Sequence, residues 1–252
     1  MTPVTSTFRP GLFHGHDVLV SGGTSGIGLA IARGFAVLGA TVVATGSSEA
    51  KIADLRQEAV PAGLTFQTLD VRDRAAVQAM VGGLDAVDVL VNAAGIARPH
   101  REFEEDTFLE VMDVNLNAAM RLAMAARPLL ARRGGSILNV GSMLSYIADA
   151  AVPAYGASKT GILGLTRHLA HAFGPEGIRV NAISPGYHRT EMTRDLWEDP
   201  SAAAKIQAKT AVRRWGTAED LVGTALFLAS PAAAYITGAD LPVDGGYVVS
   251  GF

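Results

Sequence analysis

Val20-Ser-Gly-Gly-Thr-Ser-Gly-Ile-Gly28 is a glycine-rich turn that joins the apolar segment Asp17–Ser21 to the helical pattern Gly26–Leu38. The glycines stand in a G-x-x-x-G-x-G pattern, which differs from the commoner G-x-G-x-x-G. A strand followed by glycines that open a helix is typical of a turn where bare backbone approaches a pyrophosphate. A merely flexible glycine loop is the alternative interpretation of this turn when it is taken by itself.

Apolar segments of strand length alternate with longer helical patterns through the rest of the chain. Alternation of this kind predicts an α/β fold of the Rossmann type, in which helices cover both faces of a doubly wound parallel sheet of about seven strands. Ligands bind at the carboxyl ends of the strands in such sheets. The expected strands are Asp17–Ser21, Thr41–Thr45, Leu64–Leu69, Ala86–Val91, Ser136–Val140, Ile178–Ile183 and Ala239–Val243. The expected helices are Gly26–Leu38, one from about Ser48, Asp73–Val81, about Asp106–Arg132, about Pro153–Phe173, and Leu221–Leu228 behind the capping box Thr217-Ala-Glu-Asp220.

Composition narrows the class of protein. The 252 residues are 49% hydrophobic and 18% charged, which excludes intrinsic disorder. A net charge of −3 gives no electrostatic footprint for nucleic acid, and no apolar run is long enough to span a membrane. The absence of cysteine excludes disulfides and thiolate metal sites and fits a cytoplasmic location, as does the absence of a signal-like apolar run in the first fifteen residues. We expect a single domain over residues 1–252 and no metal; His14 and His16 lie in the approach to the first strand.

Tyr155-Gly-Ala-Ser-Lys159 places a tyrosine and a lysine four residues apart, on one face of a predicted helix. A tyrosine hydroxyl normally titrates near pH 10, and a neighbouring ammonium would lower its pKa by stabilising the phenolate. The pair is therefore a candidate general acid and base. Taken alone, it could equally be an ordinary surface pair.

Further motifs accompany that pair in order along the chain: Asn92-Ala-Ala-Gly95 after the fourth strand, Asn115 in the long helix, Ser142 after the fifth strand, and Pro185-Gly186 with Thr190 after the sixth. With this joint set, from about Asp17 to Gly246, the chain resembles the single-domain form of the short-chain dehydrogenase/reductase family. The resemblance implies an NAD(P)-dependent oxidoreductase that interconverts a secondary alcohol and a ketone. The alternative of another class is a non-catalytic dinucleotide sensor on the same fold.

The resemblance implies roles for individual residues. The catalytic tetrad would be Asn115, Ser142, Tyr155 and Lys159: Tyr155 exchanges the proton, Ser142 holds the reacting oxygen, Lys159 lowers the pKa of Tyr155, and Asn115 supports a water chain. The chain departs from the family at Ala93, where a second Asn is usual. The cofactor-binding set would be Gly22, Thr24, Ser25, Gly26, Ile27, Gly28, Gly46, Ser47, Asp70, Val71, Asn92, Ala93, Gly95, Tyr155, Lys159, Pro185, Gly186, His188 and Thr190.

Cofactor choice depends on the end of the second strand. Relatives that prefer NAD usually carry Asp at the position of Gly46, and relatives that prefer NADP often carry a basic residue at the positions of Ser47 or Ser25. Neither signature is present. Without the acid there is less repulsion against a 2′-phosphate, so the sequence favours NADP over NAD by a small margin.

The irregular stretch Tyr187–Arg214 interrupts the strand–helix rhythm. We expect a substrate lid at about 187–214, partly helical around Glu191–Trp197 and Ser201–Lys209, because long loops without regular packing are usually functional or disordered. Arg214 is expected to fix loop geometry. The candidate substrate contacts are Ala97, Leu144, Tyr187 and Trp197.

The segment Ser184–Met192, together with Arg214-Trp-Gly216, resembles the branch of gluconate 5-dehydrogenase and 2-deoxygluconate 3-dehydrogenase, which implies a sugar or sugar-acid substrate. The alternative is a 3-oxoacyl-carrier-protein reductase, for which Arg98, His100 and Arg101 could supply a basic docking patch. Family members commonly pair the helices that match Asp106–Arg132 and Pro153–Phe173 between subunits. A homotetramer is therefore expected.

Overall fold

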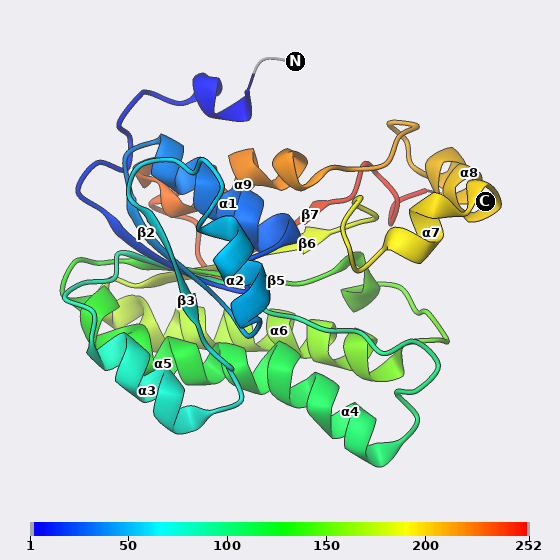
Figure 1. Ribbon diagram of the computed structural model, residues 1–252, viewed down its shortest axis with the longest axis horizontal. Coiled ribbons are helices and arrows are strands. Elements are labelled where there is room, and N and C mark those ends of the chain that lie inside the picture. The colour runs from blue at the N-terminus through cyan, green and yellow to red at the C-terminus, as the bar shows by residue number, and fades with distance from the viewer. Residues whose placement is uncertain (1–2, 251–252) are drawn as a thin grey trace.

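Seven parallel strands form one sheet in the order β3-β2-β1-β4-β5-β6-β7 in the computed structural model, which describes residues 3–250. The predicted fold class is confirmed (Figure 1). The chain winds outward from β1 in both directions, so the loops after β1 and β4 diverge at the point where the strand order reverses, and such a crevice is where ligands bind. The strands are β1 Asp17–Ser21, β2 Thr41–Gly46, β3 Leu64–Thr68, β4 Val89–Asn92, β5 Ser136–Val140, β6 Arg179–Pro185 and β7 Asp240–Val243.

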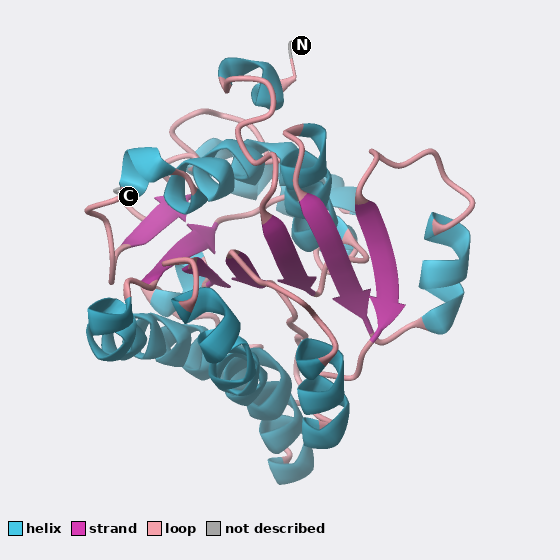
Figure 2. Cartoon of the chain, turned by 90° about the vertical axis from the view of Figure 1, so that its left-hand side faces the viewer, coloured by secondary structure: helices cyan, strands magenta, loops and turns pink. Residues whose placement is uncertain are grey.

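Two layers of helices cover the sheet, with α1 and α9 on one face and α3 to α6 on the other, while α2 lies beside β3 at the edge and packs Ile52 and Leu55 into the first layer's core (Figure 2). Each face has its own apolar core: Phe35 and Leu226 are fully buried on the first face, and Leu122 and Phe173 on the second. The centre of the sheet is therefore buried on both sides, which explains why β1, β4, β5 and β6 are largely apolar in the sequence. The helices are α1 Gly26–Val37, α2 Glu49–Leu55, α3 Arg74–Gly82, α4 Glu105–Met112, α5 Ala118–Ala131, α6 Pro153–Phe173, α7 Arg194–Glu198, α8 Pro200–Lys209 and α9 Val222–Ala229.

The long helix expected over Asp106–Arg132 is divided. A π-helical turn at Asp113–Asn117 separates α4 from α5, and Asn115 lies in its middle, buried. The apolar pattern does not predict this turn, because one extra residue in the helix leaves the hydrophobic spacing on either side intact. Turns of this kind occur frequently at functional sites.

The fourth strand begins later than expected, at Val89 rather than Ala86. The difference is due to Asp88, whose carboxylate accepts the Asp17 N–H at 2.7 Å. In a longer β4, a main-chain carbonyl would accept this N–H instead. Arg133 also pairs with Asp88, at 3.0 Å. This end of the sheet is thus closed by side chains, while the opposite, carboxyl end stays open for a site.

The segment Tyr187–Arg214 crosses that carboxyl end and contains two short helices, α7 and α8, close to where helix was expected. Arg214 pairs with Asp220 through two contacts of 2.7 Å, and Asp220 also accepts the Thr217 N–H of the capping box. The expected role of Arg214 in fixing loop geometry agrees with these contacts. Within residues 3–250, no helix has the length and apolar character needed to cross a membrane.

Candidate active site

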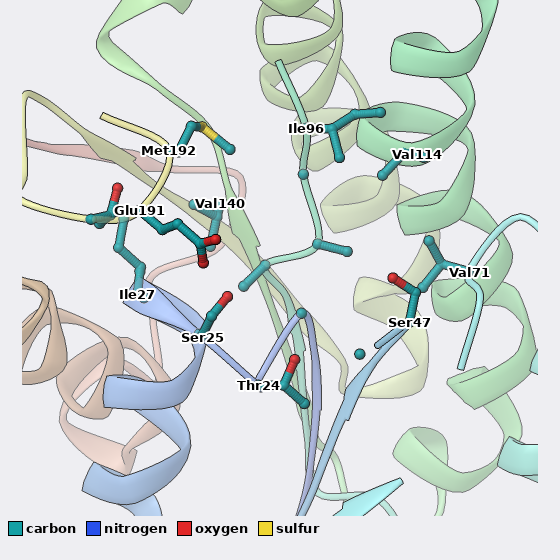
Figure 3. Close-up of a pocket in the computed structure, with 18 of the residues that line it drawn as sticks. Thr24, Ser25, Ile27, Ser47, Val71, Ile96, Val114, Val140, Glu191 and Met192 are labelled. Atoms are coloured by element: carbon teal, nitrogen blue, oxygen red, sulfur yellow. The ribbon is translucent and has the colours of Figure 1, made fainter. Parts of the chain in front are cut away.

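A cavity of about 430 Å³ runs along the carboxyl ends of the strands, from the loop after β2 to α6 (Figure 3). Its size is within the usual range for small-molecule sites. Nearly every residue that the sequence assigned to the cofactor lines it: Gly22, Thr24, Ser25, Gly26, Ile27, Gly28, Gly46, Ser47, Asp70, Val71, Ala93, Gly95, Tyr155, Lys159, Pro185, Gly186, His188 and Thr190.

The glycine-rich turn forms the floor of the cavity. Gly22 and Gly26 have φ values of +73° and +50°, and a Cβ on Gly28 would lie 2.2 Å from the carbonyl oxygen of Gly22. Ser25, the N-cap of α1, makes no side-chain capping hydrogen bond. The first N–H groups of this twelve-residue helix therefore face the cavity without a side-chain cap, as a bound pyrophosphate requires. The turn thus fits the phosphates of a dinucleotide.

The adenosine end of the cavity contains a tight contact and two cations that the sequence analysis missed. A Cβ on Gly46 would lie 2.1 Å from the Thr24 hydroxyl, so an acid at this position would have to displace a buried side chain. Lys51 and Arg72 both line the cavity near Ser47. No pattern in the sequence points to them, because Lys51 comes from the start of α2 and Arg72 from the loop after β3.

Asn92 differs from the other predicted cofactor residues in lying beneath the cavity lining. Its side-chain amide donates to Asn139 at 2.9 Å, and the amide of Asn139 donates in turn to Thr166 at 2.9 Å. All three side chains are buried. Asn92 therefore ties β4 to β5 and to α6, and it supports the loop Ala93–Ile96 without lining the cavity itself.

At the other end of the cavity, Ser142, Tyr155 and Lys159 line one wall. Ser142 follows β5, and its hydroxyl accepts the Leu144 N–H at 3.1 Å. Lys159 is 4% exposed, and its ammonium donates to the Val140 carbonyl at 2.8 Å. The ammonium lies 5.6 Å from the centre of the Tyr155 ring, so the i, i+4 spacing does bring the two side chains together.

Burial dominates the electrostatics of this wall. Desolvation raises the pKa of Tyr155, the Ser142 hydroxyl acts in the opposite direction, and the nearby Glu102 carboxylate adds to the rise. Desolvation also lowers the pKa of Lys159 to about 8. The expected lowering of the Tyr155 pKa by Lys159 is not realised in this geometry, since the ammonium is bound to the Val140 carbonyl and desolvation raises the pKa of the phenol.

Asn115 is separated from the cavity by the loop after β4. Its side-chain oxygen accepts the Ile96 N–H at 2.8 Å, and its amide donates to the Ile96 carbonyl at 2.9 Å and to Ser158 at 3.1 Å. The π-helical turn aims the side chain at these partners. Asn115 is therefore a positioning residue, which joins the loop after β4 to α6.

Glu102 is a buried carboxylate that the sequence analysis missed. It is 1% exposed and accepts the N–H groups of Arg98 and Tyr155, each at 2.8 Å. The N-cap of α6, Val152, has no side chain able to cap the helix, so this distant carboxylate caps it and fixes the first turn at Tyr155. A lone Glu in a charged stretch gives no signal of such a long-range role.

The four expected substrate contacts do not line this cavity. Ile96 and Arg98, the neighbours of Ala97, line the cavity, but Ala97 does not. Leu144, two residues after Ser142, also lies outside the lining. The Tyr187 ring packs instead on Trp215 and Tyr247, with centroids 5.6 and 5.2 Å away, and the Trp197 indole donates to the Thr190 carbonyl at 3.0 Å. Met192 enters the lining from this segment (Figure 3).

Comparison with known proteins agrees with this architecture. The profile of a family described as enoyl-(acyl carrier protein) reductase matches residues 22–248. The chain is 38% identical to the 2-dehydro-3-deoxy-D-gluconate 5-dehydrogenase of Bacillus subtilis, covering 93% of this chain and 95% of that one. It is 40% identical to the L-tagatose-forming galactitol 2-dehydrogenase of Cereibacter sphaeroides, covering 91% and 94%. A gluconate 5-dehydrogenase from Burkholderia cenocepacia, solved with NADP and tartrate, superposes with a TM-score of 0.87 at 34% identity, covering 95% of this chain and 97% of that one.

Proposed function

Because the chain belongs to the short-chain dehydrogenase/reductase family, and is thus an NAD(P)-dependent oxidoreductase acting on a secondary alcohol or ketone, we propose that its substrate is a sugar or a sugar acid. The observation that carries the activity is the wall of Ser142, Tyr155 and Lys159 at the end of a cavity floored by the glycine turn. The named relatives act on gluconate derivatives and a hexitol, which supports the substrate class.

The proposed mechanism assigns the proton to Tyr155. The glycine turn, Lys159, Pro185 and Thr190 would hold a nicotinamide cofactor, which would supply the hydride donor or acceptor. Tyr155 donates its hydroxyl proton to the ketone oxygen during reduction and accepts the alcohol proton during oxidation. Ser142 hydrogen-bonds the same oxygen and orients it.

The raised pKa of Tyr155 keeps its hydroxyl protonated at neutral pH, which suits proton donation during reduction. Oxidation requires the phenolate instead, and its fraction grows as the pH rises toward that pKa. The pKa of Lys159, lowered to about 8, reflects the burial of its own ammonium. The raised pKa of Tyr155 therefore favours proton donation, and with it the reductive direction, at neutral pH.

A substrate panel tests the function directly. Sugar acids, hexitols and aldoses are offered with NAD and NADP, and the corresponding ketones with the reduced cofactors, while nicotinamide absorbance at 340 nm is followed. Turnover on at least one polyhydroxy substrate is expected. Turnover confined to thioester-linked 3-oxoacyl substrates would replace the proposal by the carrier-protein alternative.

The charges around the cavity mouth bear on that alternative. Arg98 pairs with Glu110 at 3.2 Å and Arg101 with Glu104 at 3.5 Å, so neighbouring carboxylates offset part of the charge of the basic patch expected from Arg98, His100 and Arg101. Because both pairs are solvent-accessible, they separate at small cost, and the substrate panel decides between the two substrate classes. A dinucleotide sensor without catalysis would not need Ser142 and Tyr155 on the wall of the cavity.

The segment 187–214 is proposed as the lid of this single-domain enzyme. Two hydrogen bonds hold it in the present structure. The Thr193 hydroxyl donates to the His188 carbonyl at 2.6 Å, and the Trp215 indole donates to the Ala203 carbonyl at 3.1 Å. Hydrogen exchange should show protection rising between residues 187 and 210 from free enzyme to cofactor complex to substrate complex, while strand cores stay unchanged. Equal protection in all three states would mean that the segment is fixed scaffold.

A cytoplasmic homotetramer is proposed as the assembly. Large apolar side chains are exposed along α4 and α5: Phe108 at 36%, Leu109 at 56%, Met120 at 39% and Met124 at 42%. A second copy packed on these helices would cover them, as expected from the family resemblance. Light scattering at micromolar concentration should give four times the 26.2 kDa chain mass, and a monomer mass would contradict the proposal.

A further inference from the structure

Lys51 and Glu191 form an ion pair across the glycine turn. Lys51 lies in the first turn of α2 and Glu191 in the segment after β6, 140 residues away, yet their charged atoms are 2.6 Å apart. Both residues line the cavity, and the Glu191 side chain extends into it on the side of Ser25 (Figure 3). The pair thus connects the adenosine end of the cavity to the lid segment.

Contacts on both of its sides place the glycine turn between Lys51 and Glu191. On the α2 side, the Thr24 side chain lies against Gly46. On the lid side, a Cβ on Gly26 would lie 3.7 Å from the Thr190 methyl group. The ion pair therefore passes over the part of the cavity where the turn would hold the phosphates of a dinucleotide.

Lys51 is the cation at this end whose partner can most easily be exchanged. Arg72 is held by both oxygens of Asp70, at 2.7 to 3.2 Å, and lies 3.7 Å from Glu110. Lys51 has Glu191 as its ion-pair partner, and the two side chains are 47% and 63% exposed. An exposed ion pair stabilises a fold very little, so its partners separate at small cost.

The end of β2 is where this fold contacts the adenosine ribose, about twenty residues beyond the glycine turn, and a nearby cation accommodates a 2′-phosphate. Here that end carries Gly46 instead of an acid, followed by the hydroxyls of Ser47 and Ser48 and then by Lys51. A phosphate has more charge and more acceptor oxygens than a carboxylate, so it competes well for one ammonium group.

We propose that Lys51 is the residue that selects NADP over NAD by binding the 2′-phosphate, and that Glu191 competes with this phosphate for the Lys51 ammonium. The inference rests on the proposed function, since it assumes that a nicotinamide dinucleotide occupies the cavity. NAD leaves the Lys51–Glu191 pair intact. NADP draws Lys51 away and frees the lid segment at Glu191, whose charge is then met by Arg194, a cation already close enough to lower the Glu191 pKa.

The test compares Lys51→Gln and Glu191→Gln with Arg9→Gln, a control at an exposed cation before β1, outside both the cavity lining and the lid segment. Dissociation constants are measured for NADPH and NADH and for 2′,5′-ADP and 5′-AMP, fragments that differ by the 2′-phosphate and lack the nicotinamide. Lys51→Gln should weaken NADPH and 2′,5′-ADP by about tenfold and change NADH and 5′-AMP by less than about twofold. Glu191→Gln should tighten NADPH and 2′,5′-ADP by about two- to fivefold, because it removes the competing carboxylate.

Two results would overturn the inference. One is an equal loss of NADPH and NADH affinity in Lys51→Gln, which would make Lys51 a general phosphate contact. The other is unchanged or weaker NADPH binding in Glu191→Gln, which would remove the competition. Failure of the proposed function would look different. The unmodified protein would then fail to bind either cofactor, or it would bind a cofactor and turn over no polyhydroxy substrate.

Discussion

Tyr155→Phe should lower turnover by about 10²–10⁴-fold, the usual contribution of a general acid or base, while the protein stays folded. The substitution removes only the hydroxyl from a ring that is held by its place in α6 and by the Glu102 contact to its main chain. Cofactor affinity should change little, because Lys159 and the glycine turn are untouched. The measurement is kcat at saturating substrate and cofactor, together with the cofactor dissociation constant.

Tyr235→Phe is the matched control, because that side chain is fully exposed, at 104%, and does not line the cavity. It should retain full turnover. A Tyr155→Phe enzyme that kept more than about a tenth of the unmodified turnover would exclude Tyr155 as the proton donor. Attention would then move to Lys159, whose pKa of about 8 also allows proton transfer near neutrality.

Gly22→Ala should both destabilise the protein and abolish tight cofactor binding. The φ of Gly22 is +73°, a conformation that costs an alanine about 1–3 kcal/mol. In addition, the new Cβ would lie 2.5 Å from the main-chain nitrogen of Ala94, so the loop after β4 has to move. Both walls of the phosphate site shift as a result. Urea unfolding and cofactor titration measure the two effects.

Gly82→Ala provides the comparison for this variant. Gly82 is the last residue of α3, and a Cβ there would meet no atom within 4 Å. This substitution should stabilise the helix by up to about 1 kcal/mol, since alanine is the better helix former. If Gly22→Ala unfolded at the same urea concentration as the unmodified protein and bound cofactor normally, the turn would not be the rigid floor described above.

The sequence was sufficient for the fold because the central strands β1, β4, β5 and β6 are buried on both faces. Segments such as Ser136–Val140 are then continuously apolar, and helices of ten or more residues separate them, so the parallel sheet follows from local patterns. The glycine turn and the Tyr155–Lys159 spacing are also local, and the structure places both on the same cavity. Their roles in catalysis stay predictions until variants are measured.

Features that depend on long-range contacts could not be predicted. Glu102 caps a helix that begins fifty residues later, and Lys51 meets Glu191 across the glycine turn. Asn92 was expected at the cofactor, but its amide turns into a buried network with Asn139, which no spacing in the sequence specifies. In each case the residue type is visible in the sequence, and its partner is set only by how the layers pack.

The π-helical turn at Asp113–Asn117 contains one residue more than an ordinary helical turn. Because the wide turn absorbs that residue locally, α4 and α5 keep a common rotational phase, and Leu122 and Ala126 stay buried against the sheet. One residue removed here would restore an ordinary α-helical turn and leave the burial of α5 largely unchanged, but Asn115 would lose the orientation that joins it to Ile96. The extra residue therefore serves the loop after β4 and not the packing of the helix.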